Sequence, residues 1–183
     1  MRIGLYGGSF DPVHIGHMAV ARCAREQCGL DKVIFIPTGN MPHKKGTVAT
    51  DEQRVRMLEL SFDCDAFSVS DYEINREEIS YSADTVEHFK GVFPNDEIFF
   101  IIGGDSYAYI DKLYQPERIF SSSTVLVYPR EGEKILPPAV GLKVEPVRVS
   151  SSEIRKKINS GENVANLLKK EVLDYIIENN LYQ

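Results

Sequence analysis

The sequence contains no tryptophan and only three cysteines, and none of its apolar runs is long. Cys23, Cys28 and Cys64 lack the CxxC spacing of metal and redox motifs, so we expect small buried side chains in a reducing compartment. No apolar run approaches the roughly 20 residues of a membrane span, and the opening MRIGLYGG is too short for the core of a signal peptide. We therefore expect a cytoplasmic protein without a membrane partner.

Positive charge is also scarce, because 21 Lys and Arg face 27 Asp and Glu and leave a net charge of −6. A protein that binds nucleic acid through a broad basic face carries the opposite balance, so no nucleic-acid partner is expected. This charge is compatible with a phosphate ligand, because a phosphate site needs only a few local donors. With 183 residues, 43% of them apolar, the chain is expected to form a single domain over residues 1–183.

What the sequence does contain is an alternation of strand-like and helical segments. Strands are predicted at residues 3–6, 32–37, 67–69, 98–102, 124–128 and 143–147. Helices are predicted at residues 15–28, from an N-cap at Asp51 through Phe62, and at residues 82–90, 152–160 and 169–179. This alternation predicts an α/β fold with a doubly wound parallel sheet. Residues 151–183 are expected to form a helical C-terminal segment of the same domain.

The segment GGSFDPVHIGH at residues 7–17 carries the clearest chemical signal. It follows the first predicted strand, and doubly wound sheets bind ligands beyond the carboxyl ends of their strands. Its glycines allow backbone N–H groups to approach a phosphate, and Gly16 is expected to leave room for the adenine or the ribose. His14 and His17 are expected on one side of a helix N-terminus, where imidazoles can donate to the phosphate oxygens of ATP. The GxGxxG and GxxxxGK[ST] phosphate loops are absent from the sequence.

Three further segments are candidates for the rest of this site, and each also has a plain structural interpretation. Ser150 and Ser151 precede an apolar-periodic stretch with Arg155 one turn in, which predicts either an anion site or a capped surface helix. PHKK at residues 42–45 is either a phosphate donor or a solvated basic loop. GGDS follows the most apolar strand, and its Asp105 either accepts from ribose hydroxyls or caps an ordinary glycine turn.

Taken together, these segments resemble the nicotinate-mononucleotide adenylyltransferase family of NAD biosynthesis, over essentially the whole chain. GGSFDPVHIGH matches the first family signature, and the further motifs follow in the family's order and spacing: PHK at 42–44, DTV at 84–86, IIGGDS at 101–106 and VSSSEIR at 149–155. YIIENNLY at 175–182 is similar to the family's C-terminal helix. The resemblance implies a Rossmann-like nucleotidyltransferase fold. It also implies adenylyl transfer, in which ATP and nicotinate mononucleotide give nicotinate adenine dinucleotide and pyrophosphate by direct attack on the α-phosphorus.

The resemblance implies a role for each candidate residue. His14, His17 and Arg155 are the catalytic candidates, of which the two histidines contact the ATP phosphates. The implied ATP-binding set is Gly7, Gly8, Ser9, Phe10, His14, Gly16, His17, Gly103, Asp105, Ser106, Ser150, Ser151 and Arg155. The implied mononucleotide-binding set is Lys44, Thr85, Leu113 and Tyr114. Mg²⁺ is expected to arrive with ATP, held by phosphates and water rather than by protein ligands. The implied partners are ATP and a pyridine mononucleotide, and a homo-oligomer is left open.

The chain departs from the family pattern where the pyridine ring is expected. The family usually has a Trp-Tyr pair after its GxD motif, whereas this chain has Leu113 and Tyr114, and Ser82 stands where the family has a threonine. Thr85, whose counterpart helps to receive the nicotinate carboxylate, is retained. Loss of the indole weakens stacking on the pyridine. The acceptor is therefore left open between the acid and the amide form of the mononucleotide.

Three rival functions share part of these motifs. HIGH is also the ATP motif of class I aminoacyl-tRNA synthetases, but this chain is short for an anticodon-binding domain and acidic for a tRNA partner. A phosphopantetheine adenylyltransferase typically lacks the PHK and DTV stretches. A nucleotide-sensing module without turnover is expected to have lost His14, His17 or Arg155, and all three are present.

Overall fold

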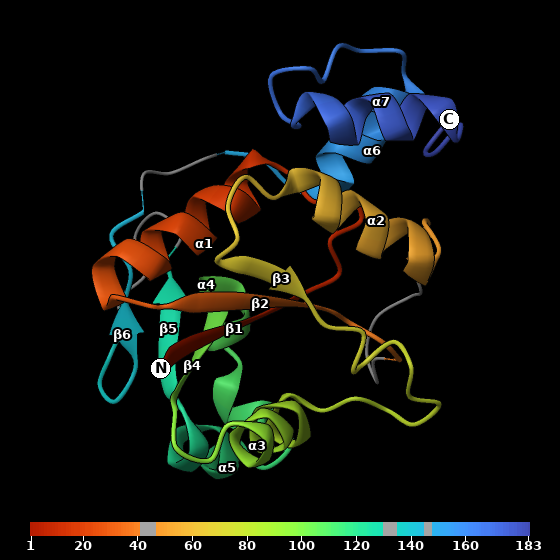
Figure 1. The fold of residues 1–183 in the computed structure, drawn as a ribbon. Coiled ribbons are helices and arrows are strands. Elements are labelled where there is room, and N and C mark those ends of the chain that lie inside the picture. Colours follow the sequence, from red (N-terminus) through yellow and green to blue (C-terminus); the bar gives the residue numbers. More distant parts are fainter. Residues whose placement is uncertain (41–46, 130–134, 145–147) are drawn as a thin grey trace.

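The structure, a computed structural model, describes residues 1–40, 47–129, 135–144 and 148–183. Its centre is a six-stranded sheet of order β3-β2-β1-β4-β5-β6, in which every neighbouring pair is parallel. The strands are β1 (Arg2–Gly8), β2 (Lys32–Pro37), β3 (Phe67–Val69), β4 (Glu97–Gly103), β5 (Thr124–Tyr128) and β6 (Val140–Gly141) (Figure 1). The strand order reverses between β1 and β4, and ligands bind at such switch points. The prediction of a doubly wound parallel sheet is confirmed.

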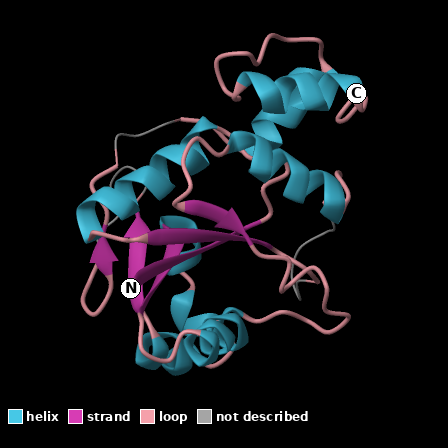
Figure 2. Cartoon of the chain, in the orientation of Figure 1, coloured by secondary structure: helices cyan, strands magenta, loops and turns pink. Residues whose placement is uncertain are grey.

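Helices cover both faces of this sheet (Figure 2). They are α1 (Ile15–Cys28), α2 (Asp51–Ser61), α3 (Ser82–Val92), α4 (Gly104–Tyr107), α5 (Pro116–Ser122), α6 (Ser151–Asn159) and α7 (Lys170–Glu178), with a 3₁₀ turn η1 (Ile110–Lys112). In Figure 1, α1 and α2 lie on one face, α3 and α5 lie on the other, and α6 and α7 lie beyond α2. Among the described helices, none combines the length and the apolar character needed to cross a membrane.

Alternate strand residues feed two separate cores, one on each face. Tyr6 and Ile101 pack toward α1 and α2, whereas Leu5 and Phe100 pack toward α3 and α5. Central parallel strands are apolar on both faces for this reason. The C-terminal segment joins the first of these cores through Ile154, Val172, Ile176 and Tyr182. The segment after residue 150 is thereby held beside the helices that begin at the ligand-binding edge of the sheet.

The last strand differs from its prediction. The sequence predicts a strand at 143–147, but β6 is Val140–Gly141, and the described residues 143–144 are not strand. Residues 145–147 lie outside the described part of the chain. The backbone of Lys143 bonds instead to the side chain of Gln27 in α1: its N–H donates to Oε1 at 3.0 Å, and its carbonyl accepts from Nε2 at 2.9 Å. A side-chain amide therefore takes the place of a strand partner at this position.

Two local expectations also need correction. The N-cap of α2 is Thr50 rather than Asp51, because Thr50 Oγ1 accepts the backbone N–H of Gln53 at 3.3 Å and Gln53 Oε1 accepts that of Thr50 at 2.9 Å. This reciprocal capping box satisfies two backbone donors and lets Asp51 occupy the first helical position. The expectation of buried cysteines is also wrong, because Cys64 is exposed and the other two are only partly buried.

Candidate functional site

The turn from β1 into α1 places two histidines at the switch point of the sheet. His14 is the N-cap of α1, and its Nδ1 accepts the backbone N–H of His17 at 3.4 Å. His17 Nδ1 accepts the backbone N–H of His14 at 3.2 Å in return, and the two rings stack with centroids 3.7 Å apart. Because each Nδ1 accepts a backbone N–H, each neutral ring carries its proton on Nε2. The helix therefore begins with two side-chain N–H donors at the positive end of its dipole.

Burial keeps both imidazoles neutral. It lowers the pKa of His14 to about 4. Burial, and next the charge that His14 would carry, lower the pKa of His17 well below its usual range. The ring of His17 lies against Phe10 at 5.0 Å and against Tyr6 at 6.2 Å between centroids. At neutral pH the site thus offers uncharged N–H donors, which suit phosphate oxygens.

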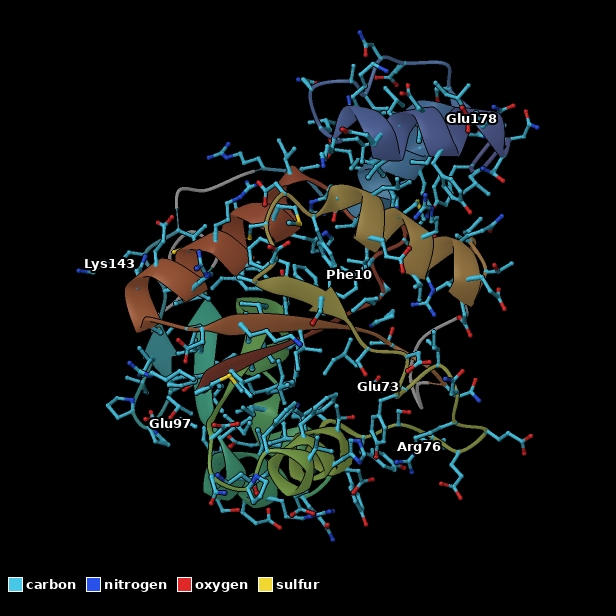
Figure 3. The ribbon with its side chains drawn as sticks, in the orientation of Figure 1. Phe10, Glu73, Arg76, Glu97, Lys143 and Glu178 are labelled. Carbon is cyan, nitrogen blue, oxygen red and sulfur yellow. The ribbon has the colours of Figure 1, made fainter. Side chains whose placement is uncertain are left out.

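The ring of Phe10 packs against the imidazole of His17 and supports it. Its ring is fully buried between the sheet and the helices α1 and α2 (Figure 3), and its φ of 47° lies in the left-handed region. A Cβ on Gly8 would lie 2.9 Å from Phe10 Cζ, so only glycine leaves room for this ring. The nearest atom to a Cβ on Gly7 would be 4.0 Å away. Since the Phe10 side chain is buried, a ligand can meet this residue only through its backbone.

Gly16 also has a structural reason to be a glycine. A Cβ on Gly16 would lie 3.0 Å from His14 Cε1 and 3.0 Å from Val149 Cγ1. A larger side chain at this position would therefore collide with these two residues. The glycine lets the imidazole of His14 and the residue before Ser150 come together.

The N-terminus of α6 is attached directly to this turn. Ser150 is its N-cap and accepts the backbone N–H of Glu153 at 3.2 Å. Ser151 Oγ donates to the carbonyl of Pro12 at 2.9 Å, and Arg155 Nη1 donates to the carbonyl of Asp11 at 2.6 Å. The structure therefore brings the serine segment and Arg155 beside the histidine segment, as the sequence predicts.

The carboxylate of Asp11 lies at the centre of this junction, although sequence reasoning gave it no role. Its two oxygens accept from the backbone N–H groups of Val48 at 2.8 Å and Ala49 at 3.1 Å, and from the hydroxyl of Tyr182 at 2.7 Å. Arg155 Nη1 lies 3.7 Å from Oδ2. The sequence signalled the importance of Asp11 only through its place in the FDP motif, because its bonding partners come from segments far away in sequence.

Arg54 is a second residue that the sequence did not reveal. Its side chain is 1% exposed, and its guanidinium donates to the carbonyls of Ser9 and Thr38, each at 2.9 Å. It therefore ties the loop after β1 to the end of β2. The helical pattern of α2 favours an exposed position for an arginine, so periodicity gave no signal for this contact.

The GGDS segment lies at the same edge of the sheet, because β4 pairs with β1. Gly103 ends β4, and Asp105 and Ser106 lie exposed in the short helix α4. A Cβ on Gly103 would lie 2.9 Å from the hydroxyl oxygen of Tyr128, so the glycine accommodates that side chain. The structure thus places the GGDS segment next to the histidine turn across the switch point.

The residues expected to bind the mononucleotide are less fully assembled. Lys44 and the rest of the PHKK segment lie outside the described residues. Thr85 is 2% exposed, and its hydroxyl donates to Oε1 of Glu73 at 2.6 Å, in the loop between β3 and α3 (Figure 3). Leu113 packs partly buried against the second core. The exposed ring of Tyr114 stacks on Tyr81 with centroids 4.4 Å apart.

Within the described ranges, no group of three or more His, Cys, Asp and Glu side chains could hold a metal ion. The carboxylate of Asp11, which lies nearest the histidine turn in sequence, accepts three hydrogen bonds from the protein and forms an ion pair with Arg155.

Comparisons with known proteins point to one group. A family model described as cytidylyltransferase-like matches residues 5–157. A probable nicotinate-nucleotide adenylyltransferase of Clostridium botulinum (strain Eklund 17B / Type B) is 37% identical over 199 residues, covering 100% of this chain and 98% of the relative. One of Thermus thermophilus is 39% identical over 187 residues and covers 100% of both chains.

Solved structures agree with the fold. The Plasmodium falciparum nicotinic acid mononucleotide adenylyltransferase complexed with NaAD superposes with a TM-score of 0.84 at 21% identity, covering 99% of this chain and 97% of that chain. The same protein complexed with APC gives a TM-score of 0.82 at 20% identity, covering 99% and 96%. At these identities the likeness shows the fold alone.

Proposed function

Because this chain belongs to the cytidylyltransferase-like family, and within it to the nicotinate-nucleotide adenylyltransferases, we propose that it transfers the adenylyl group of ATP to nicotinate mononucleotide. The products are nicotinate adenine dinucleotide and pyrophosphate. The observation that carries this proposal is the stacked pair His14 and His17 at the N-terminus of α1, with Arg155 attached to the same turn. Full-length relatives of this name support the choice of acceptor.

The chemistry is a direct displacement at the α-phosphorus of ATP. An oxygen of the mononucleotide phosphate forms a bond to that phosphorus, the bond to the β-phosphate bridging oxygen breaks, and pyrophosphate leaves. The Nε2–H groups of His14 and His17 donate to phosphate oxygens on which charge develops. Ser150 and Arg155 hold the leaving pyrophosphate, aided by the free amides at the start of α6. The residues act by position and charge, with no covalent intermediate.

The remaining contacts complete the two substrate sites. Asp105 accepts from the ribose hydroxyls of ATP, and the backbone of residues 7–10 and 103–106 approaches the nucleotide. Lys44 binds a phosphate, Thr85 helps to receive the nicotinate carboxylate, and Leu113 and Tyr114 flank the pyridine ring. The ring pair of Tyr81 and Tyr114 supports this assignment, because it offers an aromatic surface next to Leu113, where the family has its indole.

Magnesium enters this proposal as part of the nucleotide substrate. Mg²⁺ prefers phosphate and water oxygens together with one or two carboxylates. The ATP phosphates and water therefore supply most of its ligands.

The proposal also takes residues 1–183 as one domain. It places the protein in the cytoplasm, where free thiols such as Cys23, Cys28 and Cys64 are usual.

A comparison of acceptors tests the proposal. The protein is mixed with ATP and Mg²⁺, and pyrophosphate release is measured with nicotinate mononucleotide, nicotinamide mononucleotide, phosphopantetheine or no acceptor. The proposal predicts release that depends on a pyridine mononucleotide, with the acid form preferred. Release with phosphopantetheine alone contradicts the acceptor, and ATP binding without turnover on any acceptor contradicts the enzymatic function.

A further inference from the structure

The side chain of Tyr182 reaches the centre of the candidate site. Tyr182 is 8% exposed, and its hydroxyl donates to Asp11 Oδ1 at 2.7 Å across 171 residues of sequence. Its φ of 65° lies in the left-handed region, which residues with a Cβ adopt rarely. Burial and an uncommon backbone conformation at this position indicate that the contact with Asp11 holds Tyr182 in place.

Tyr182 and Arg155 meet on the same residue from two different segments. Oδ1 of Asp11 accepts from Tyr182 and from Ala49, whereas Oδ2 lies 3.7 Å from Arg155 Nη1. Oδ2 also accepts from Val48, and the carbonyl of Asp11 accepts from Arg155 Nη1. The hydroxyl of Tyr182 and the guanidinium of Arg155 therefore lie beside different oxygens of one carboxylate.

We propose that Tyr182 is a positioning residue that sets the orientation of Arg155 through Asp11 and so strengthens the binding of the ATP triphosphate. When a buried carboxylate loses one hydrogen-bond donor, a conformation that supplies another donor is favoured, because burial of an unpaired charged oxygen costs free energy. Without the Tyr182 hydroxyl, Arg155, whose Nη1 already lies 3.7 Å from Oδ2, turns toward Asp11 and away from the anion. The inference rests on the proposed function in one respect, that Arg155 binds the phosphates of ATP.

The chemistry of the phenol suits this role. Burial first, and then the hydrogen bond to Asp11, raise the pKa of Tyr182 far above its usual range. Its hydroxyl is therefore always a donor at working pH. The ring packs in the first core beside Met57, with the hydroxyl 4.0 Å from its Sδ, so Tyr182→Phe removes the donor and keeps the packing.

A double-mutant cycle tests the coupling. The Kd of the MgATP complex is measured by calorimetry for the wild type, Tyr182→Phe, Arg155→Ala and the double variant. Tyr182→Phe alone is expected to raise Kd about 3- to 10-fold, the scale of one hydrogen bond. In the Arg155→Ala background the same change is expected to alter Kd less than about twofold, because coupled residues are not additive. An equal effect of Tyr182→Phe in both backgrounds overturns the inference.

Tyr175→Phe is the matched control, since Tyr175 lies in the same C-terminal segment and packs partly buried against the same core. It is expected to bind MgATP with the wild-type Kd, and a weakening equal to that of Tyr182→Phe overturns the inference. A reversibly unfolded fraction raises the apparent Kd in proportion, so all Kd values are measured at a temperature at which circular dichroism shows each variant to be folded. Coupling in ATP binding without turnover of any pyridine mononucleotide supports the inference and contradicts the proposed acceptor. If the wild type turns over a pyridine mononucleotide but the effects of Tyr182→Phe and Arg155→Ala on Kd are additive, the proposed function is supported and the inference is contradicted. A wild type that fails to bind MgATP contradicts both.

Discussion

At the scale of single residues, two stacked imidazoles form the reciprocal cap that a serine or threonine and a glutamate or glutamine form in a capping box. In His14 and His17 the Nδ1 atoms cap the backbone of α1, which leaves the Nε2–H groups for other partners. Capping and phosphate binding thus use different atoms of the same ring. A substitution can therefore separate the two roles.

The first prediction uses this separation at His17. Asparagine keeps an oxygen near the position of Nδ1 that can accept the N–H of His14, but it has no donor at the position of Nε2. His17→Asn is expected to fold like the wild type and to lower kcat about 10²-fold or more, the scale of one lost transition-state donor. Thermal unfolding and steady-state kinetics check the two parts. A variant with unchanged kcat refutes the assignment of His17.

The second prediction concerns acid stability. The pKa of His14 is about 4 in the folded protein against a reference value of 6.5. The unfolded chain therefore binds this proton first, and the free energy of unfolding falls as pH drops from 6.5 toward 4. This loss amounts to about 2 kcal/mol at pH 5 for one such histidine.

His14→Asn isolates that effect, because asparagine is a good N-cap and does not titrate. Urea unfolding at pH 7 and at pH 5 is expected to show a smaller loss for the variant than for the wild type, by about 2 kcal/mol. Equal losses in both proteins mean that His14 is not held neutral by burial.

At the scale of elements, the strand-to-helix turn after β1 depends more on Gly8 than on Gly7. Alanine at Gly8 collides with the ring of Phe10, which supports His17, whereas alanine at Gly7 meets no atom closer than 4.0 Å. Gly8→Ala is expected to lower the free energy of unfolding by about 1–3 kcal/mol, as overpacking does, and Gly7→Ala by less than about 0.5 kcal/mol. Urea unfolding of both variants checks this, and equal effects contradict the supporting role of Phe10.

Elements were predictable where a local pattern specifies them. Strands β2, β3 and β5 and helix α1 have the predicted bounds, since hydrophobic periodicity is a property of neighbouring residues. The strand predicted at 143–147 is not formed at the described residues 143–144, because Gln27 of α1, far away in sequence, bonds to the backbone of Lys143. The short helices α4 and α5 went unpredicted, since seven residues or fewer give little periodic signal.

The candidate site divides in the same way. The histidines, the serines and Arg155 were predictable because they stand in motifs with recognisable spacing. The burial of Arg54 under the carbonyl of Ser9 was not, since an arginine in an amphipathic helix is usually solvated. The convergence of Tyr182 and Ala49 on Asp11 depends on tertiary packing, which no local pattern records.

At the scale of the whole molecule, the chain returns to one edge of the sheet several times. The turn after β1 and the turn after β4 flank the switch point, and α6 and the end of the chain attach to the first of these turns. Each segment contributes a different chemical group. The turn after β1 supplies two neutral imidazole donors, the turn after β4 supplies the carboxylate of Asp105, α6 supplies the guanidinium of Arg155, and Tyr182 supplies a buried phenol. The doubly wound order explains why residues so far apart in sequence meet there.

Adenylyl transfer is tested most directly by following the phosphorus atoms of ATP. With nicotinate mononucleotide as acceptor, ATP labelled at the α-phosphorus is expected to give labelled nicotinate adenine dinucleotide. ATP labelled at the γ-phosphorus is expected to give labelled pyrophosphate. The α-label in free AMP, or the γ-label in orthophosphate, with no labelled dinucleotide, would contradict the account.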